Sequence, residues 1–105
     1  MKNVINVKVA NTFVKKLIGL MFKKDCSYNL MFEGTSAIHT FFMRFPIDCL
    51  CLDKNNKLIT IIKNIKPWRV VFAPSKTKSI VELKSDNINL ESFKIGQVVT
   101  IHKNN

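Results

Sequence analysis

The stretch PIDCLCLDKNNKLITIIKNI, residues 46–65, constrains the fold more than any other part of this sequence. Two apolar runs of strand length flank the turn signal DKNNK, in which Asn56 can adopt the left-handed backbone that such hairpins require. The proline at position 46 suits the beginning of a strand. The stretch therefore predicts an antiparallel hairpin with a polar turn at residues 53–57.

Short apolar segments separated by turn signals continue on both sides of this hairpin. Further strands are expected within residues 2–9, 29–32, 37–43, 66–74, 78–84 and 96–102. A short helix is expected over TFVKKLIGLM, residues 12–21, and one helical turn over NLESFKI before Gly96. About seven short strands with one N-terminal helix predict a mainly β domain, α+β by content, built as a β-sandwich or a partly open barrel.

Length and composition favour one globular domain over residues 1–105, with 47% hydrophobic residues to fill its core. The longest stretch without a charged residue runs only from Gly34 to Met43, far short of the roughly 18 residues that a membrane span needs. Lys8 also interrupts any apolar region of a signal peptide. These features predict a cytoplasmic protein with no membrane partner, and they set no oligomeric state.

The three cysteines favour small buried thiols in a reducing compartment. A metal site could be drawn from Cys26, His39, Cys49 and Cys51, but their spacing matches none of the usual zinc ligand pairs. The sequence also lacks a glycine-rich phosphate loop and the common hydrolase motifs. Neither a metal nor another cofactor is therefore predicted.

The net charge is +10, from 17 basic and 7 acidic residues, and it raises the question of a polyanionic partner. Fifteen of the basic residues are lysines scattered along the chain, and only Lys15-Lys16 and Lys23-Lys24 are adjacent. Nucleic-acid readers concentrate their charge and rely on arginine. A lysine-coated surface is therefore favoured over a dedicated polyanion site, and nonspecific nucleic-acid binding remains an alternative.

A group of polar residues lies within apolar surroundings, where each residue needs a partner or a cleft. The group comprises His39, Arg44, Asp48, Trp68, Arg69 and Glu82. Because Phe41 and Phe42 are both apolar, the strand that should contain them is expected to be covered on both faces.

Two interpretations of this group stay open. In the first, Asp48 and Glu82 are the counter-charges of the two arginines in an internal ion-pair network that fixes strand register. In the second, the group forms the floor of a polar pocket with Trp68 at its lip. In either case Asp48 is predicted to be at least half buried and bonded to Arg44, to Arg69 or to backbone amides of the Phe45-Pro46 turn.

With these residues assembled, the sequence resembles the prokaryotic family called domain of unknown function 192, from about Val7 to Ile101. The carriers of the resemblance are GLM at 19–21, LMF at 30–32, HTFFMRFPID at 39–48, LD at 52–53, KPWR at 66–69 and VEL at 81–83. The resemblance implies a mostly β, sandwich-like single domain, and it implies no activity because the family is uncharacterised.

The chain departs from the family pattern at three places. Lys84-Ser85-Asp86 stands where the family tends to have a Pro-x-Gly turn, and Gly96-Gln97 stands where it tends to have Gly-Asp. Asn56 replaces a glycine. If the missing aspartate serves a site in the family, that site is altered here, whereas the turn changes affect loops.

Three functions are compatible with the sequence. The favoured one is a non-catalytic binding module in which the six polar residues hold a small polar or anionic ligand, such as a carbohydrate or a carboxylate. The second is an enzyme that uses His39 as general base, oriented by Asp48 or Glu82. The third is nonspecific polyanion binding through the +10 charge. No catalytic residue is assigned, and whether the chain is an enzyme stays open.

Overall fold

The computed structural model describes residues 4–9, 29–84 and 90–103. Within these ranges the chain forms eight strands in two open sheets and a single 3-10 turn. The elements are β1 Val4–Val9, β2 Asn29–Glu33, β3 Ala37–His39, β4 Ile47–Leu52, β5 Leu58–Ile65, β6 Val70–Phe72, β7 Ser79–Lys84, η1 Leu90–Ser92 and β8 Thr100–Lys103. The predicted mainly β fold of one domain is confirmed.

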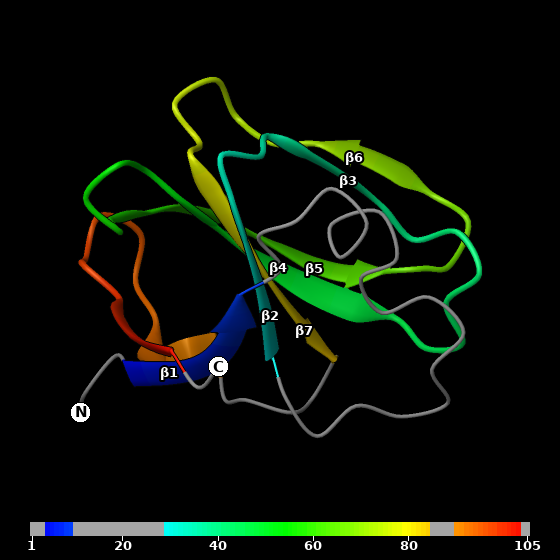
Figure 1. Ribbon diagram of the computed structural model, residues 1–105, viewed down its shortest axis with the longest axis horizontal. Coiled ribbons are helices and arrows are strands. Elements are labelled where there is room, and N and C mark those ends of the chain that lie inside the picture. The colour runs from blue at the N-terminus through cyan, green and yellow to red at the C-terminus, as the bar shows by residue number, and fades with distance from the viewer. Residues whose placement is uncertain (1–3, 10–28, 85–89, 104–105) are drawn as a thin grey trace.

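Six strands form the larger sheet, in the order β5-β4-β7-β2-β1-β8. β1 runs parallel to both of its neighbours, β2 and β8, whereas the other pairs in this sheet are antiparallel. The smaller sheet is the antiparallel pair β3-β6, which lies over the β4-β5 side of the larger sheet (Figure 1).

β4 lies in the interior of the larger sheet, and all six of its residues are buried. Its side chains alternate between two hydrophobic clusters because successive residues of a strand point to opposite faces. Ile47 and Cys49 join the cluster beneath the smaller sheet, which also contains Ile38 of β3. Leu50 and Leu52 join the cluster on the other face. The core of the protein therefore has two layers, one on each face of the larger sheet.

The predicted hairpin is confirmed as β4, a turn at residues 53–57, and β5. Asn56 has a φ of 61°, in the left-handed region that the turn requires. Asp53 Oδ1 accepts hydrogen bonds from the backbone amides of Asn55 at 2.8 Å and Lys57 at 3.0 Å. These amides stabilise the charged carboxylate and lower the pKa of Asp53.

One expectation about local structure needs correction. The strand expected over residues 37–43 ends at His39, and Phe41 and Phe42 lie exposed in a turn instead of between two covered faces. The N-terminal helix expected over residues 12–21 lies outside the described residues, and no α-helix occurs within them. The single helical turn before Gly96 is confirmed as η1.

No helix within the described ranges is long and apolar enough to cross a membrane.

Candidate binding site: an aromatic loop cluster

Two loops, residues 40–46 and 66–69, meet beside the β3-β6 sheet, and Thr40 joins them. The Thr40 amide donates to the Arg69 carbonyl at 2.8 Å, and the Trp68 amide donates to the Thr40 carbonyl at 2.9 Å. The Thr40 hydroxyl donates to the Lys66 carbonyl at 2.7 Å and accepts from the Arg69 amide at 2.9 Å. Thr40 is completely buried, so these bonds are shielded from water and hold the two loops as one unit.

Phe42 and Trp68 are the most unusual residues of these loops. Both have a left-handed backbone, with φ of 63° and 66°, which costs on the order of 1–3 kcal/mol for a bulky residue. Their rings lie 4.7 Å apart between centroids, and the residues are 44% and 56% exposed. Because both rings are largely exposed, the strained backbone that positions them adds little to the packing of the core. These two residues are therefore the centre of the candidate site.

His39 and Phe41 extend this group of rings. The Phe41 ring lies 5.7 Å from that of Trp68 and 5.1 Å from the imidazole of His39. His39 Nδ1 accepts a hydrogen bond from the Phe41 amide at 3.2 Å, which places the proton of a neutral imidazole on Nε2. We call His39, Phe41, Phe42 and Trp68 the aromatic loop cluster.

The charged residues of the same loops are cations. Arg44 is exposed and lies two residues after Phe42. Arg69 is also exposed, and its guanidinium lies 3.4 Å from the carbonyl oxygens of Pro67 and Trp68. Residues 34–47 and 54–81 contain no aspartate or glutamate. These two described segments, which include the loops of the aromatic loop cluster, therefore supply basic residues and no carboxylate.

Asp48 lies inside the protein, at 6% exposure, as predicted. The register of β4 and β5 pairs Ile47 with Ile65 and Cys49 with Ile62, which leaves two β5 residues opposite Asp48 in a β-bulge. Asp48 Oδ1 accepts a hydrogen bond from the Asn64 amide of this bulge at 2.8 Å, where Asn64 has a φ of 53°. One partner of Asp48 is thus a backbone amide of β5, which was not among the partners expected from the sequence.

Glu82 lies in β7, between Leu30 of β2 and Cys49 of β4 in the strand register. It is 3% exposed, and burial raises its pKa to about 8, so the carboxyl is mostly neutral at pH 7. Burial, with smaller contributions from Glu82, Cys51 and Asp48, raises the pKa of the Cys49 thiol well above its usual range. Cys49 is therefore an inert core thiol and not a nucleophile.

The structure divides the six predicted site residues into two groups. The first group lies in the two loops beside the β3-β6 sheet. It contains His39 and Trp68, whose rings both lie beside the ring of Phe41, together with Arg69. Arg44 belongs to this group because it lies in the same loop as Phe41 and Phe42. Asp48 and Glu82 are both buried, but on opposite faces of the larger sheet. Residues paired across neighbouring strands share a face, and Asp48 pairs with Leu83 whereas Glu82 pairs with Cys49. Leu83 and Cys49 belong to the hydrophobic clusters on the two different faces. The structure therefore does not bring the two carboxyls together in one network.

The position of His39 also bears on catalysis. Ile38 points into the core, so its neighbour His39 faces the outer side of the β3-β6 sheet. Glu82 lies on the core side of that sheet, and Asp48 points to the far face of the larger sheet. Neither carboxyl is on the side where it could orient the imidazole as the general-base hypothesis requires.

Sequence reasoning did not identify Thr40, Phe41 or Phe42 as site residues. The available signal was a hydroxyl residue next to two phenylalanines in the run HTFFM. This run alone does not reveal the role of Thr40, because its hydrogen-bond partners Lys66 and Arg69 are distant in the sequence and reach it only in the folded chain.

Comparison with known proteins places the chain in a family. The model of domain of unknown function 192, described as Uncharacterized ACR, matches residues 1–101. A UPF0127 protein of Pyrococcus horikoshii is 35% identical over 82 residues, which cover 72% of this chain and 70% of that protein. A UPF0127 protein of Pyrococcus furiosus is 33% identical over 98 residues, covering 88% of this chain and 83% of the relative. Against a UPF0127 protein of Thermococcus sibiricus, 31% identical, the chain covers 64% of the relative's length.

Two solved structures share the fold, each at 17% sequence identity and each over 86% of this chain. One is a protein of unknown function from Novosphingobium aromaticivorans, with a TM-score of 0.74 and 70% of its own chain covered. The other is a putative transcription regulator from Sinorhizobium meliloti, with a TM-score of 0.75 and 76% covered. These likenesses support the fold alone. Since the family model spans nearly the whole sequence, and the Pyrococcus relatives match most of it, the chain belongs to the family of domain of unknown function 192.

Proposed function

We propose that this protein is a non-catalytic binding module whose aromatic loop cluster, with Arg44 and Arg69, holds a small anionic ligand that has an apolar or ring face. A sugar acid or another small carboxylate has this chemistry. The observation that supports the proposal is the contact between exposed Phe42 and Trp68, both on left-handed backbone.

The proposed roles follow from the chemistry of the side chains. Trp68 and Phe42 offer apolar faces for stacking, and the ring faces attract C–H groups and cations. Arg69 and Arg44 present planar guanidinium groups, which bind carboxylates in a bidentate manner. The basic residues of these loops, in segments 34–47 and 54–81 that contain no carboxylate, favour an anion over a cation as the ligand.

Trp68 is the only tryptophan in the sequence, so its fluorescence reports directly on this site. We expect glucuronate to change Trp68 emission in a saturable manner, and glucose, which lacks the carboxylate, to bind more weakly. Arg69→Gln should weaken binding of glucuronate by about tenfold, because an arginine–carboxylate hydrogen bond contributes roughly 1.5–3 kcal/mol. Lys94→Gln, which removes an exposed cation outside these loops, serves as the matched control.

If a panel of sugar acids and small carboxylates leaves Trp68 emission unchanged, the proposal is wrong. Equal effects of Arg69→Gln and Lys94→Gln would also count against it, because attraction by the net charge alone predicts that result.

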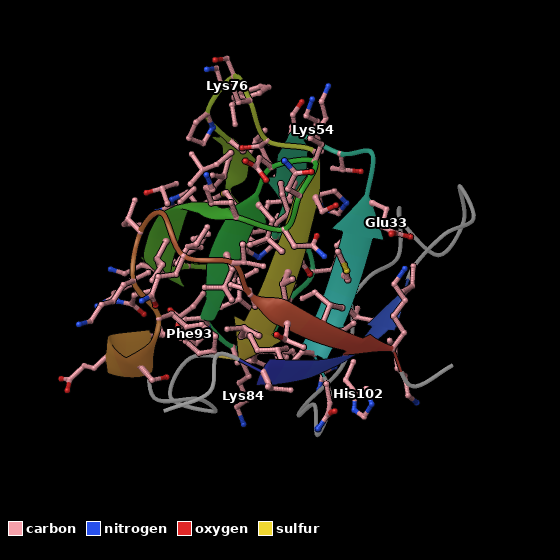
Figure 2. The ribbon with its side chains drawn as sticks, turned by 90° about the vertical axis from the view of Figure 1, so that its left-hand side faces the viewer. Glu33, Lys54, Lys76, Lys84, Phe93 and His102 are labelled. Atoms are coloured by element: carbon pink, nitrogen blue, oxygen red, sulfur yellow. The ribbon has the colours of Figure 1, made fainter. Side chains whose placement is uncertain are left out.

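The other two hypotheses receive less support. The enzyme hypothesis requires Asp48 or Glu82 beside His39, but neither of these carboxyls lies on the outer side of β3, where His39 faces. A dedicated polyanion site needs its charge on one face, but Figure 2 shows Lys54 and Lys76 at one end of the molecule and Lys84 at the opposite end. No observation therefore favours either as a second function.

A further inference from the structure

The exposed apolar surface continues from the aromatic loop cluster onto β6. Val70 and Phe72 are 52% and 77% exposed, whereas Val71 between them packs against the core. Val70 pairs with His39 in the strand register and follows Trp68 by two residues, so the two areas are continuous. We call the aromatic loop cluster together with Val70 and Phe72 the outer apolar surface.

Among the described residues, the segments that adjoin the outer apolar surface in sequence, 40–46, 66–69 and 73–78, carry only positive charge. Arg44, Lys66 and Arg69 lie in its loops, and Lys76 and Lys78 follow β6. All five are exposed. The surface therefore combines large apolar side chains with cations, on a protein whose net charge is +10.

We infer that the outer apolar surface docks on an anionic lipid bilayer. The inference rests on the proposed anion-binding function and names lipid phosphate as the anion. In this arrangement Phe42, Trp68 and Phe72 enter the headgroup region, where aromatic side chains are favoured, and Lys66 and Arg69 contact phosphates. Aromatic side chains bury apolar area at that depth, while long basic side chains reach the headgroups.

The composition and shape of the surface favour a bilayer over a protein partner. Lysine is depleted in protein–protein interfaces, but three of the five cations here are lysines. A second copy of this chain would bring together two molecules of charge +10, which repel each other. The Trp68 ring is tilted by 32° to the Phe41 ring and by 59° to the Phe42 ring, so the three rings form no flat surface for a protein partner. A fluid bilayer needs no such shape complementarity.

The expectation of no membrane partner was based on the lack of a spanning segment. Docking on a bilayer surface requires no such segment, because a few inserted side chains and the attraction between cations and anionic lipids supply the binding.

The test uses the full chain with vesicles of equal parts phosphatidylglycerol and phosphatidylcholine, and with vesicles of phosphatidylcholine alone. We expect the protein to sediment with the anionic vesicles and Trp68 emission to shift to shorter wavelength. Phe72→Ser should lower the partition coefficient by about tenfold, as expected for a phenylalanine that no longer enters the bilayer. Lys66→Glu should lower it by at least about fivefold, whereas Lys94→Glu should change it less than about twofold.

Circular dichroism of each variant confirms that it folds, and the two different surface variants keep the test decisive if one of them fails to fold. Sedimentation without a Trp68 shift, or an equal loss with Lys66→Glu and Lys94→Glu, would mean adsorption by diffuse charge and would overturn the inference. A Trp68 response to poly-glutamate but not to vesicles would identify a polypeptide partner and would also overturn it.

The same titrations separate this inference from the proposed function. If glucuronate or glycerol phosphate changes Trp68 emission but anionic vesicles do not, the bilayer inference fails and the anion-binding module stands. If neither soluble anions nor vesicles have an effect, both fail.

Discussion

Two apolar strands of this protein, β4 and β6, have similar side chains and opposite surroundings. Every residue of β4 is buried, because β5 and β7 flank it and hydrophobic clusters cover both of its faces. β6 belongs to a two-stranded sheet that covers the core with one face only, so Val70 and Phe72 point outward. Apolar residues therefore stabilise the fold in β4, whereas those on the outer side of β6 are available for binding.

The ionisable groups differ in the same way. Asp48 and Glu82 are buried in the larger sheet, where each must be bonded or neutral. Arg44 and Arg69 are exposed in the loops beside the smaller sheet, where they can meet a ligand. Changes in the larger sheet should therefore alter stability, and changes on the outer side of the smaller sheet should alter the binding that we propose and leave stability nearly unchanged.

The largest effect is expected from the ionisation of Glu82. The pKa of Glu82 is about 8 in the folded protein, against 4.5 for a free glutamate, so the folded state binds this proton more tightly. The resulting stability is fully present below the pKa of the unfolded chain and is lost as the pH rises through about 8. The loss amounts to about 5 kcal/mol at most, from a pKa difference of 8 − 4.5.

Urea denaturation of the wild type and of Glu82→Gln across this pH range measures the effect. Glu82→Gln keeps the size of the side chain and removes its ionisation, so its stability should depend less on pH than that of the wild type. Parallel pH profiles of the two proteins would show that Glu82 ionises freely and is not the buried acid described above.

A smaller loss is expected when the core of β4 is truncated. Leu50 is fully buried, so Leu50→Ala should lower the free energy of unfolding by about 2–5 kcal/mol through lost burial and a cavity. The matched change on β6, Val70→Ala, should cost no more than about 0.5 kcal/mol because Val70 is half exposed. Chemical denaturation of both variants measures the difference, and similar losses would contradict the contrast between the two strands.

An intermediate effect is expected at Asp48. Asp48→Ala leaves the Asn64 amide of the β-bulge without the acceptor that now lies 2.8 Å away, at a cost of about 1–3 kcal/mol. Asp48→Asn should cost less, since its amide oxygen can still accept that hydrogen bond. Denaturation midpoints, together with amide exchange at Asn64, test this order. A midpoint equal to that of the wild type for both variants would remove the structural role assigned to Asp48.

The smallest effect on stability is expected at Phe72. Because this side chain is 77% exposed, Phe72→Ser should change the free energy of unfolding by no more than about 0.5 kcal/mol. Thermal denaturation of this variant and of Val71→Ser provides the comparison, as Val71 packs against the core and should be the more sensitive. A large loss from Phe72→Ser would mean that the outer side of β6 is part of the core after all.

The sequence alone determined the elements whose signals are local. The hairpin of β4 and β5 follows from two apolar runs and the DKNNK turn, and Asn56 takes the left-handed backbone expected of it. The segments HTFFMRFPID and KPWR also indicate a candidate site, because polar residues in apolar surroundings are visible in the sequence. Each of these features depends on residues a few positions apart.

Only the tertiary structure decided how these pieces combine. Thr40 forms hydrogen bonds with Lys66 and Arg69, which are 26 and 29 positions away in the sequence. These bonds hold the chain in a turn directly after β3, and Phe41 and Phe42 are exposed there. The pairing of β4 with β7 sends Asp48 and Glu82 to opposite faces. A periodic pattern shows which residues of one strand share a face, but it does not show which strands pair or which sheet lies above them. Side chains as similar as those of β4 and β6 can therefore be buried in one strand and exposed in the other.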